Sequence, residues 1–451
     1  MITLLAIDWA TVGVKAGQLI LSLSILVILH ELGHFLPAKF FKCRVEKFFL
    51  FFDPWFALFK KRVGETVYGV GWLPLGGYVK ISGMVDESMD KEQMKQPAQP
   101  WEFRSKPAWQ RLIIMIGGVT VNLILGFLLF AMILGVWGED RLPLNKMTDG
   151  VWVTPISESV GVRNGDRIIG VDNKPLDDYF DITRKIILDE GKTVQVERDG
   201  KQLSFDLPKG TIRSLIKSKS QFVLPRLPTV VDSVTPAANF TSNKLQRGDR
   251  IVAINDTLVP FYDEFTESKK QYRDQEVTLT VLRNNDTVLV KAKTDTGAVL
   301  GFNIDTEISD VPGAYKKNYN LFTSIPAGIR KGWETLVMNI KNFKLLFTSE
   351  EVKASESLGS FISIGNLFSA EWDWEQFWTM TALLSIVLAF MNILPIPALD
   401  GGHVLFTLYE MITGRKPSDK FMEFAQMIGM ILLLALMAYA IGLDFWRYLW
   451  K

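Results

Sequence analysis

The sequence predicts a polytopic α-helical membrane protein with four transmembrane helices, a membrane re-entrant β-hairpin and two extracytoplasmic β-rich domains. Three observations lead to this class. Four long windows carry almost no charge, two segments between the second and third windows repeat one another, and a glycine-rich β-prone stretch follows the first window. The net charge is only +1. A chain with so little net charge has no overall positive electrostatic field that would attract a polyanion, so we expect no nucleic-acid partner.

The four apolar windows are the candidate membrane spans. Each has about the 20 residues that a helix needs to cross the hydrocarbon core of a bilayer. Buried helices of a large soluble core are the alternative, but uncharged windows of this length are typical of a membrane protein. The windows cover residues 16–41, 112–138, 377–399 and 424–443.

Lysine and arginine are unevenly distributed around these windows. Residues 37–111 contain thirteen of them, and Arg415, Lys416 and Lys420 follow the third window, whereas the N-terminal flank has only Lys15. The positive-inside rule therefore places both basic loops in the cytoplasm. Both termini and the segment 139–375 are then expected on the extracytoplasmic side of the bilayer.

Two stretches after the first window suggest structure at membrane depth. Residues 48–59 are very apolar but too short to span, and Asp53-Pro54 interrupts them. They are interpreted as re-entrant or interfacial. Residues 67–81 are rich in glycine and β-prone residues, which predicts a hairpin. Irregular backbone at that depth must be covered by protein or line a cavity.

The segment between the second and third windows contains an internal repeat. Gly165-Asp166-Arg167-Ile168 recurs as Gly248-Asp249-Arg250-Ile251, and each copy is followed by a short helical pattern and a strand–turn–strand pattern. The two copies predict small domains over residues 148–210 and 226–307. They resemble bacterial PDZ domains, which bind an extended peptide as an added strand. A β-rich spacer without a ligand is the alternative.

Helical spacing of apolar residues continues after the repeats. It predicts an amphipathic helix or helix pair over residues 315–350. The remaining parts of the chain are then an N-terminal part, residues 1–138, with the first two spans, and a C-terminal part, residues 376–451, with the last two.

The first span contains the pattern His30-Glu31-Leu32-Gly33-His34. Two histidines four residues apart lie on one helical face, so both can bind one Zn²⁺. Glu31 is displaced from His30 by about 100° around the helix and can act as a general base. A pair of ordinary core histidines would not explain ionisable side chains in a lipid-spanning helix, where they are costly and usually functional.

A third metal ligand is expected at the end of the third window. Asp400 is the only carboxylate between Glu375 and Glu410, and it follows Pro395 and Pro397, which must break the helix. Catalytic zinc needs three protein ligands and an open position. His403 is the rival ligand, or a partner of Asp400.

These motifs together resemble the site-2 protease family, in the bacterial type that includes the regulator of sigma-E protease. The resemblance covers essentially the whole chain and depends most on the HExxH pattern and on the run from Asn392 to His403. It implies an intramembrane zinc metalloendopeptidase that holds one zinc ion per chain. The roles carried over by motif are zinc binding for His30, His34 and Asp400, general base for Glu31, substrate contact for Asn392, Pro395 and Pro397, and help to the oxyanion for Asn122.

The resemblance also implies partners and a location. The substrate would be a single-pass membrane protein, such as an anti-sigma factor or a signal-peptide remnant, cleaved in its transmembrane segment after an upstream site-1-type protease has trimmed it. The setting would be transmembrane stress signalling in the bacterial cytoplasmic (inner) membrane.

The chain departs from the family at Val119, where proline is usual, and at Gly359-Ser360-Phe361, where Ser-Gly-Pro is usual. Neither departure replaces a ligand.

Two other classes of function stay open at this level. A non-catalytic membrane scaffold with PDZ modules would not need Glu31 between two histidines. A metal transporter would place acidic residues or histidines in several spans, yet the second and fourth windows have none.

Overall fold

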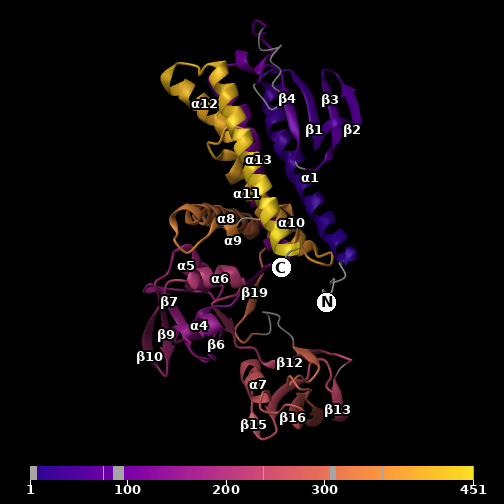
Figure 1. Ribbon diagram of the computed structural model, residues 1–451, viewed down its shortest axis with the longest axis vertical. Coiled ribbons are helices and arrows are strands. Elements are labelled where there is room, and N and C mark those ends of the chain that lie inside the picture. Colours follow the sequence, from indigo (N-terminus) through magenta and orange to yellow (C-terminus); the bar gives the residue numbers. More distant parts are fainter. Residues whose placement is uncertain are drawn as a thin grey trace. The chain divides into compact units, whose positions relative to one another are not determined.

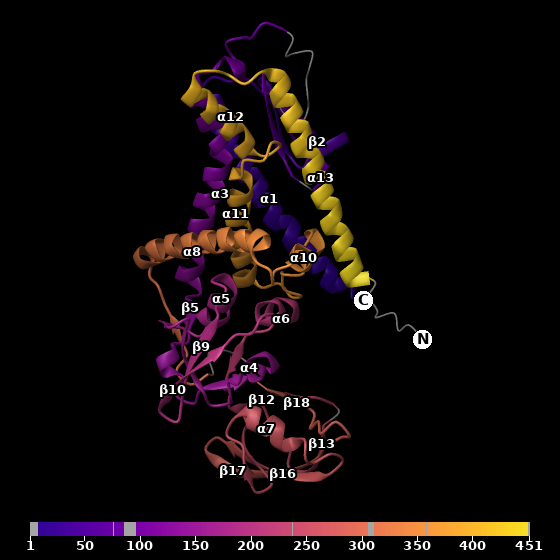
Figure 2. The same ribbon diagram turned by 60° about the vertical axis from the view of Figure 1, so that its left-hand side comes forward.

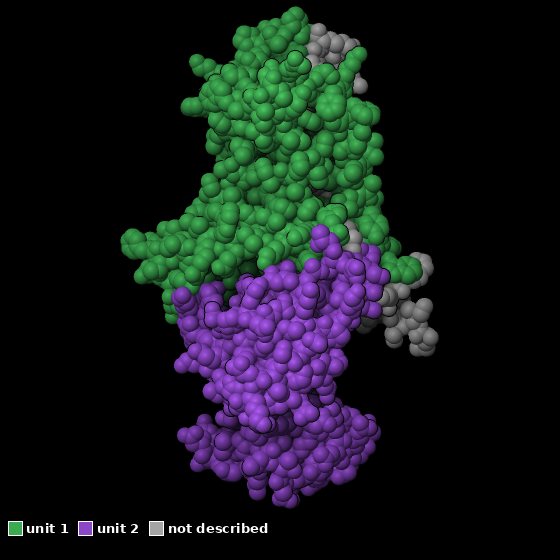
Figure 3. All heavy atoms as spheres, turned by 90° about the vertical axis from the view of Figure 1, so that its left-hand side faces the viewer, with its two compact units in different colours: residues 1–137, 318–347, 357–451 green, residues 138–317, 348–356 purple. Residues whose placement is uncertain are grey.

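The computed structural model describes residues 8–74, 76–84, 96–236, 238–304, 311–357 and 359–449. The chain divides into two compact units, coloured separately in Figure 3. Unit 1 comprises Met1–Trp137, Asn318–Phe347 and Ser357–Lys451, and unit 2 comprises Gly138–Lys317 and Thr348–Glu356. Leu75 of the expected hairpin and residues 305–307 of the expected second domain lie outside the described residues.

Within its described residues, unit 1 has four helices long and apolar enough to cross a membrane, which confirms the four expected spans. They are α1 (Trp9–Phe40), α11 (Trp374–Ile393) and α13 (Asp419–Leu449), labelled in Figure 1, and α3 (Ala108–Val136), labelled in Figure 2. The third is shorter than its apolar window, because Pro395 and Pro397 cannot continue a helix. The protein is therefore a multi-pass membrane protein.

Glycines allow α1 and α3 to approach closely. A Cβ atom on Gly33 would lie 2.5 Å from the carbonyl oxygen of Gly117, and one on Gly117 would lie 2.0 Å from the carbonyl oxygen of Gly33. Small residues permit such backbone contact between membrane helices. On its other side, α3 packs against α11, where Ile386 occupies the space beside Gly126. Helix α3 thus lies between α1 and α11 and antiparallel to α1.

A four-stranded sheet follows α1 in the order β2-β3-β1-β4. Its strands are β1 (Val45–Leu50), β2 (Phe52–Val63), β3 (Thr66–Leu73) and β4 (Tyr78–Ile81). The expected hairpin over residues 67–81 is wrong, because β3 and β4 do not pair with each other. Strand β1 lies between them, parallel to β3 and antiparallel to β4. Residues 48–59 form the end of β1 and the first part of the edge strand β2.

The order of the strands has a packing cause. Val45 and Phe49 of β1 are buried, so β1 is the strand anchored in the protein core. Pro54, which has no N–H to donate, lies in the edge strand β2, within the irregular pairing between Phe52 and Ala57. Strand β4 is the other edge.

The helical pattern of residues 315–350 corresponds to one helix, α8 (Leu321–Thr348). Figure 2 shows it lying across α3 and α11. Its small residues Gly328 and Gly332 face Ala131 and Phe127 of α3. Beside this contact, α8 carries exposed apolar side chains, namely Leu321, Ile325, Ile329, Trp333, Val337 and Ile340. Helices α10 (Phe361–Gly365) and α12 (Asp400–Thr413), with the 3₁₀ helix η1 (Phe103–Ser105), are also part of unit 1.

Unit 2 contains both copies of the sequence repeat. The first copy gives a sheet of order β10-β9-β7-β8, and the second belongs to a sheet of order β13-β17-β16-β14-β12-β18, with β15 paired to β14. The strands are β6 (Val151–Val153), β7 (Arg167–Val171), β8 (Lys174–Pro175), β9 (Thr193–Arg198), β10 (Lys201–Asp206), β11 (Val223–Pro225), β12 (Thr229–Val234), β13 (Asn239–Ser242), β14 (Arg250–Ile254), β15 (Thr257–Leu258), β16 (Glu276–Arg283), β17 (Asp286–Lys293) and β18 (Phe302–Ile304). The α-helices are α4 (Pro155–Val160), α5 (Asp181–Leu188), α6 (Thr211–Ser218) and α7 (Tyr262–Lys269), with α9 (Ala354–Ser357) at the unit boundary, and η2 (Leu144–Lys146) is a 3₁₀ helix.

The two Gly-Asp motifs adopt the same local structure. Gly165 and Gly248 have φ angles of +89° and +86°. Asp166 then accepts a 2.7 Å hydrogen bond from Arg198, and Asp249 accepts one of 2.7 Å from Arg283. A short pair of strands, β5 (Glu139–Arg141) and β19 (Tyr315–Lys317), brings the two ends of the segment together.

Candidate metal centre

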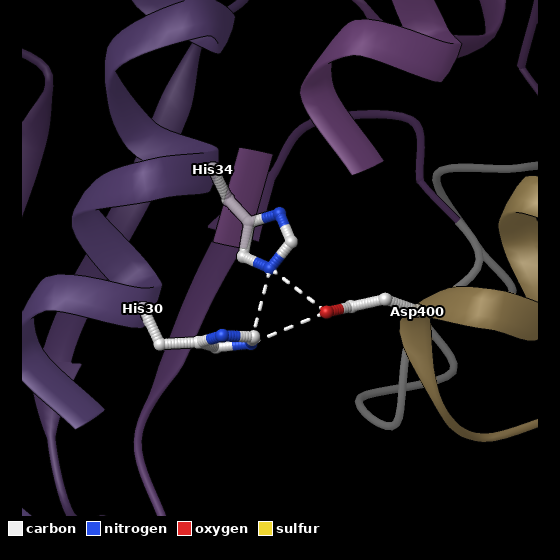
Figure 4. A group of neighbouring side chains, drawn as sticks. All are labelled: His30, His34 and Asp400. Carbon is white, nitrogen blue, oxygen red and sulfur yellow. Dashed lines mark hydrogen bonds and ion pairs between the residues drawn. The ribbon is translucent and has the colours of Figure 1, made fainter. Parts of the chain in front are cut away.

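Two helices supply the side chains of the candidate metal centre. His30 and His34 lie one turn apart on α1, and Asp400 is the first residue of α12. Figure 4 shows the two imidazole rings and the carboxylate pointing toward a common point. These three residues form a group whose ligand atoms all lie within 4.8 Å of one another.

The spacing of the three ligand atoms fits a zinc ion. Oδ2 of Asp400 lies 3.2 Å from Nε2 of His30 and 3.2 Å from Nε2 of His34, and the two nitrogens are 3.3 Å apart. Zinc bonds of about 2.0–2.1 Å in a tetrahedral arrangement separate ligand atoms by about 3.3–3.4 Å. The triangle therefore matches one face of a zinc tetrahedron, and a zinc ion held by these three residues would have a fourth position for a reactant.

His34 is held in the form that a metal requires. Its Nδ1 lies 2.9 Å from the backbone carbonyl oxygen of Ile114 on α3. A carbonyl oxygen can only accept, so Nδ1 carries the proton and Nε2 keeps its lone pair in the neutral ring. This is the usual arrangement of a histidine that binds zinc.

The broken end of the third span places Asp400. Helix α11 ends at Ile393, and Ala398 has a φ angle of +85°, which turns the chain just before α12 begins. The turn is tightly packed, because a Cβ atom on Gly401 would lie 2.1 Å from the carbonyl oxygen of Leu394. Gly429 of α13 packs as closely against the carbonyl oxygen of Pro397. Pro395 and Pro397 thus shape the loop that positions the carboxylate of Asp400.

Gly118 of α3 borders the ligand triangle and is absent from the site residues expected from the sequence. A Cβ atom there would lie 2.4 Å from Nε2 of His34 and 2.7 Å from Cε1 of His30. The Gly117-Gly118 pair within a continuous apolar window is the signal that could have found it, because small residues mark close helix contacts in membranes.

The other expected site residues lie at different places around the triangle. Glu31 is buried on α1, and Gly77, just before β4, lies against it: a Cβ atom on Gly77 would be 3.3 Å from Cγ of Glu31. The side-chain nitrogen of Asn392 lies 3.4 Å from Nε2 of His30. Asn122 contacts the same ring at Nδ1, at 3.3 Å. His403 instead lines a cavity with Arg111, Glu410 and other residues, none of which belongs to the triangle.

Comparisons with known proteins agree with this site. The model of peptidase family M50 matches residues 18–436. The chain is 28% identical over 459 residues to the regulator of sigma-E protease RseP of Escherichia coli, covering 96% of this chain and 98% of the relative. It is 27% identical to protease RseP of Yersinia pestis over 95% of this chain and 97% of the relative. A Treponema pallidum protein, named as an inferred zinc metalloprotease, is 25% identical over 90% of this chain and 93% of its own length. The chain therefore belongs to peptidase family M50, the site-2 protease family, and is a zinc metalloprotease.

Proposed function

We propose that the protein cleaves the transmembrane segment of single-pass membrane proteins, using one zinc ion held by His30, His34 and Asp400. The observation that carries this proposal is the position of the ligand triangle. Two of its three members lie on a helix long and apolar enough to cross a membrane, which supports chemistry at membrane depth.

The residues around the ligand triangle have different roles in hydrolysis. Zinc, when bound, polarises a carbonyl group and lowers the pKa of a water molecule. Glu31, next to His30 on α1, takes the proton from the attacking water and passes it to the leaving nitrogen. Ile114 keeps Nε2 of His34 available through its contact with Nδ1. The amide nitrogen of Asn392 lies 3.4 Å from Nε2 of His30. From there it would donate a hydrogen bond to the substrate carbonyl.

The sheet supports the binding of an unwound substrate. A peptide bond inside a helix is inaccessible, and once a helix is unwound in lipid its backbone groups need new partners. Strand β4 is an edge of the sheet, and Gly77, the residue just before it, lies against Glu31. A substrate segment added to this edge would have its backbone paired next to the base. Pro395 and Pro397 would border the segment on the side of Asp400.

Strand β2 is suited to contact with lipid. Trp55, Phe56, Leu58 and Phe59 are all more than half exposed, which is unfavourable in water. Trp55 and Phe56 also stack with Trp72 of β3. We place this part of the sheet in the membrane, as a re-entrant element.

Removal of metal from the purified protein is expected to abolish cleavage of a membrane-anchored model substrate. One equivalent of Zn²⁺ should restore it, and Mg²⁺ should not, because two imidazoles and one carboxylate suit zinc, whereas Mg²⁺ prefers oxygen ligands. Cleavage rate and zinc content per chain are the measurements. Full activity in metal-free protein would contradict the proposal.

The orientation inferred from the basic loops needs a reporter other than Cys43. This thiol is 3% exposed, and burial raises its pKa, so little reactive thiolate forms at neutral pH. In a Cys43→Ser background, Lys61→Cys at the exposed end of β2 should resist an impermeant thiol reagent added to intact spheroplasts. Lys201→Cys in unit 2 should react with it. The opposite pattern would reverse the proposed topology, in which both termini and unit 2 are extracytoplasmic.

We further propose that unit 2 consists of two PDZ-like domains that exclude bulky substrates. In this view, an upstream protease trims the substrate first, and the protein completes regulated proteolysis in the inner membrane. Ligand activation by a bound peptide strand is the alternative.

A deletion can distinguish these two modes. Arg141 and Tyr315 are paired across β5 and β19, so residues 142–314 can be replaced by a short linker with little displacement of the ends. Exclusion predicts that the shortened protein cleaves full-length and trimmed substrates at similar rates. Ligand activation predicts loss of cleavage for both. A folded, active deletion that still requires trimming would reject exclusion by these domains.

A further inference from the structure

The two histidines of the candidate metal centre differ in what contacts their Nδ1 atoms. His34 faces a backbone carbonyl oxygen, as described above. His30 faces the side-chain amide of Asn122, whose nitrogen is placed 3.3 Å from Nδ1. Asn122 is completely buried, and its Oδ1 has no hydrogen-bond partner among the described residues.

That orientation of the amide conflicts with metal binding. If Nδ2 of Asn122 donates to Nδ1 of His30, Nδ1 must hold a lone pair, and the proton of the neutral ring lies on Nε2. Nε2 is the atom that points to Asp400 and His34. A protonated Nε2 cannot bind zinc.

Exchange of the amide oxygen and nitrogen resolves the conflict. The two atoms of an asparagine amide are distinguished only by their hydrogen bonds. With Oδ1 next to the ring, Nδ1 donates its proton to Asn122 and the lone pair of Nε2 faces the open centre. In the first orientation the buried Oδ1 has no hydrogen-bond partner among the described residues, so no second hydrogen bond holds the amide that way and the requirement of the metal decides between the orientations.

We infer that Asn122 is a positioning residue that accepts a hydrogen bond from Nδ1–H of His30 and holds this ring in its zinc-binding tautomer. This inference rests on the proposed zinc binding by His30. It differs from the oxyanion role implied for Asn122 by resemblance. The two nitrogens of an imidazole point away from each other. An amide that contacts Nδ1 therefore lies on the far side of the ring from Nε2, the atom that would bind zinc.

The surroundings of Asn122 support a fixed orientation. Gly118 and Asn122 are one turn apart on α3. The side of α3 that packs against the rings of His30 and His34 therefore also carries the amide of Asn122. Ser385 of α11 donates a 2.7 Å hydrogen bond to the backbone carbonyl oxygen of Asn122. The residue is thus held between two helices.

The test compares Asn122→Leu and Asn122→Asp in the full-length purified protein, with zinc affinity measured by competition with a chelator. Asn122→Leu removes the acceptor and should weaken zinc binding about 10–100-fold, the usual cost of losing such a partner. An ionised aspartate only accepts, so Asn122→Asp should bind zinc at least as tightly as the unmodified protein. Thr120→Val, on an exposed position of the same helix, is the matched control.

Turnover at saturating zinc separates the two roles of Asn122. A positioning residue predicts that excess zinc restores most of the activity of Asn122→Leu. Unchanged zinc affinity in Asn122→Leu with turnover lost at zinc saturation would overturn the inference in favour of the oxyanion role. Zinc binding by Asn122→Asp as weak as that of Asn122→Leu would overturn it too. Failure of the proposed function is distinguishable, because His30→Ala would then bind zinc as tightly as the unmodified protein.

Discussion

Replacement of Glu31 by glutamine is expected to lower turnover of a membrane-anchored substrate by about 10²–10⁴-fold, the usual contribution of a general base. Glutamine keeps the size of the side chain but cannot take a proton from water. Bound zinc should remain, because the ligand triangle consists of other residues. Zinc content per chain and cleavage rate, measured on the same preparation, test both parts.

The control for this variant is Glu65→Gln, which makes the same chemical change at an exposed position in the turn before β3. It should cleave at the rate of the unmodified protein. Cleavage at that rate by Glu31→Gln would show that the hydrolytic mechanism proposed for this site is wrong.

Replacement of Gly118 by alanine is expected to weaken zinc binding by more than about 100-fold, beyond the usual cost of altering a neighbour of a ligand. The added methyl group would lie 2.4 Å from Nε2 of His34, inside the contact distance of the atom that binds the metal. The ring cannot withdraw without losing its hydrogen bond to Ile114. Alanine favours a helix more than glycine does, so helix propensity would not explain the loss.

Gly17→Ala on α1 is the matched control, because a Cβ atom at this exposed position meets no heavy atom within 4 Å. Both variants should be expressed and folded, and only Gly118→Ala should lose zinc and activity together. Normal zinc affinity in Gly118→Ala would show that the helices separate easily at this contact, contrary to the packing described here.

The sequence by itself determined the features that depend on local chain geometry. The length and hydropathy of four windows predicted four spans, because a bilayer sets the length of a helix that crosses it. The spacing of His30 and His34 placed them on one face, because a helix repeats every 3.6 residues. Asp400 could be chosen as the third ligand because it stands alone among apolar residues after a proline-broken helix.

Only the tertiary structure decided what depends on contacts between distant segments. Strand β1 pairs with β3 along one edge and with β4 along the other. The alternation of residues along a strand indicates which face is buried, but it does not indicate which strands pair with it. The crowding of Gly118 against two histidines, and the contact of Asn122 with one nitrogen of His30, exist because α1 and α3 approach at Gly33 and Gly117. The burial of Cys43 has the same origin: it lies in a core cluster with residues of β1, β4 and α3. Such contacts depend on how closely two backbones pack, and this distance is set by both partners at once.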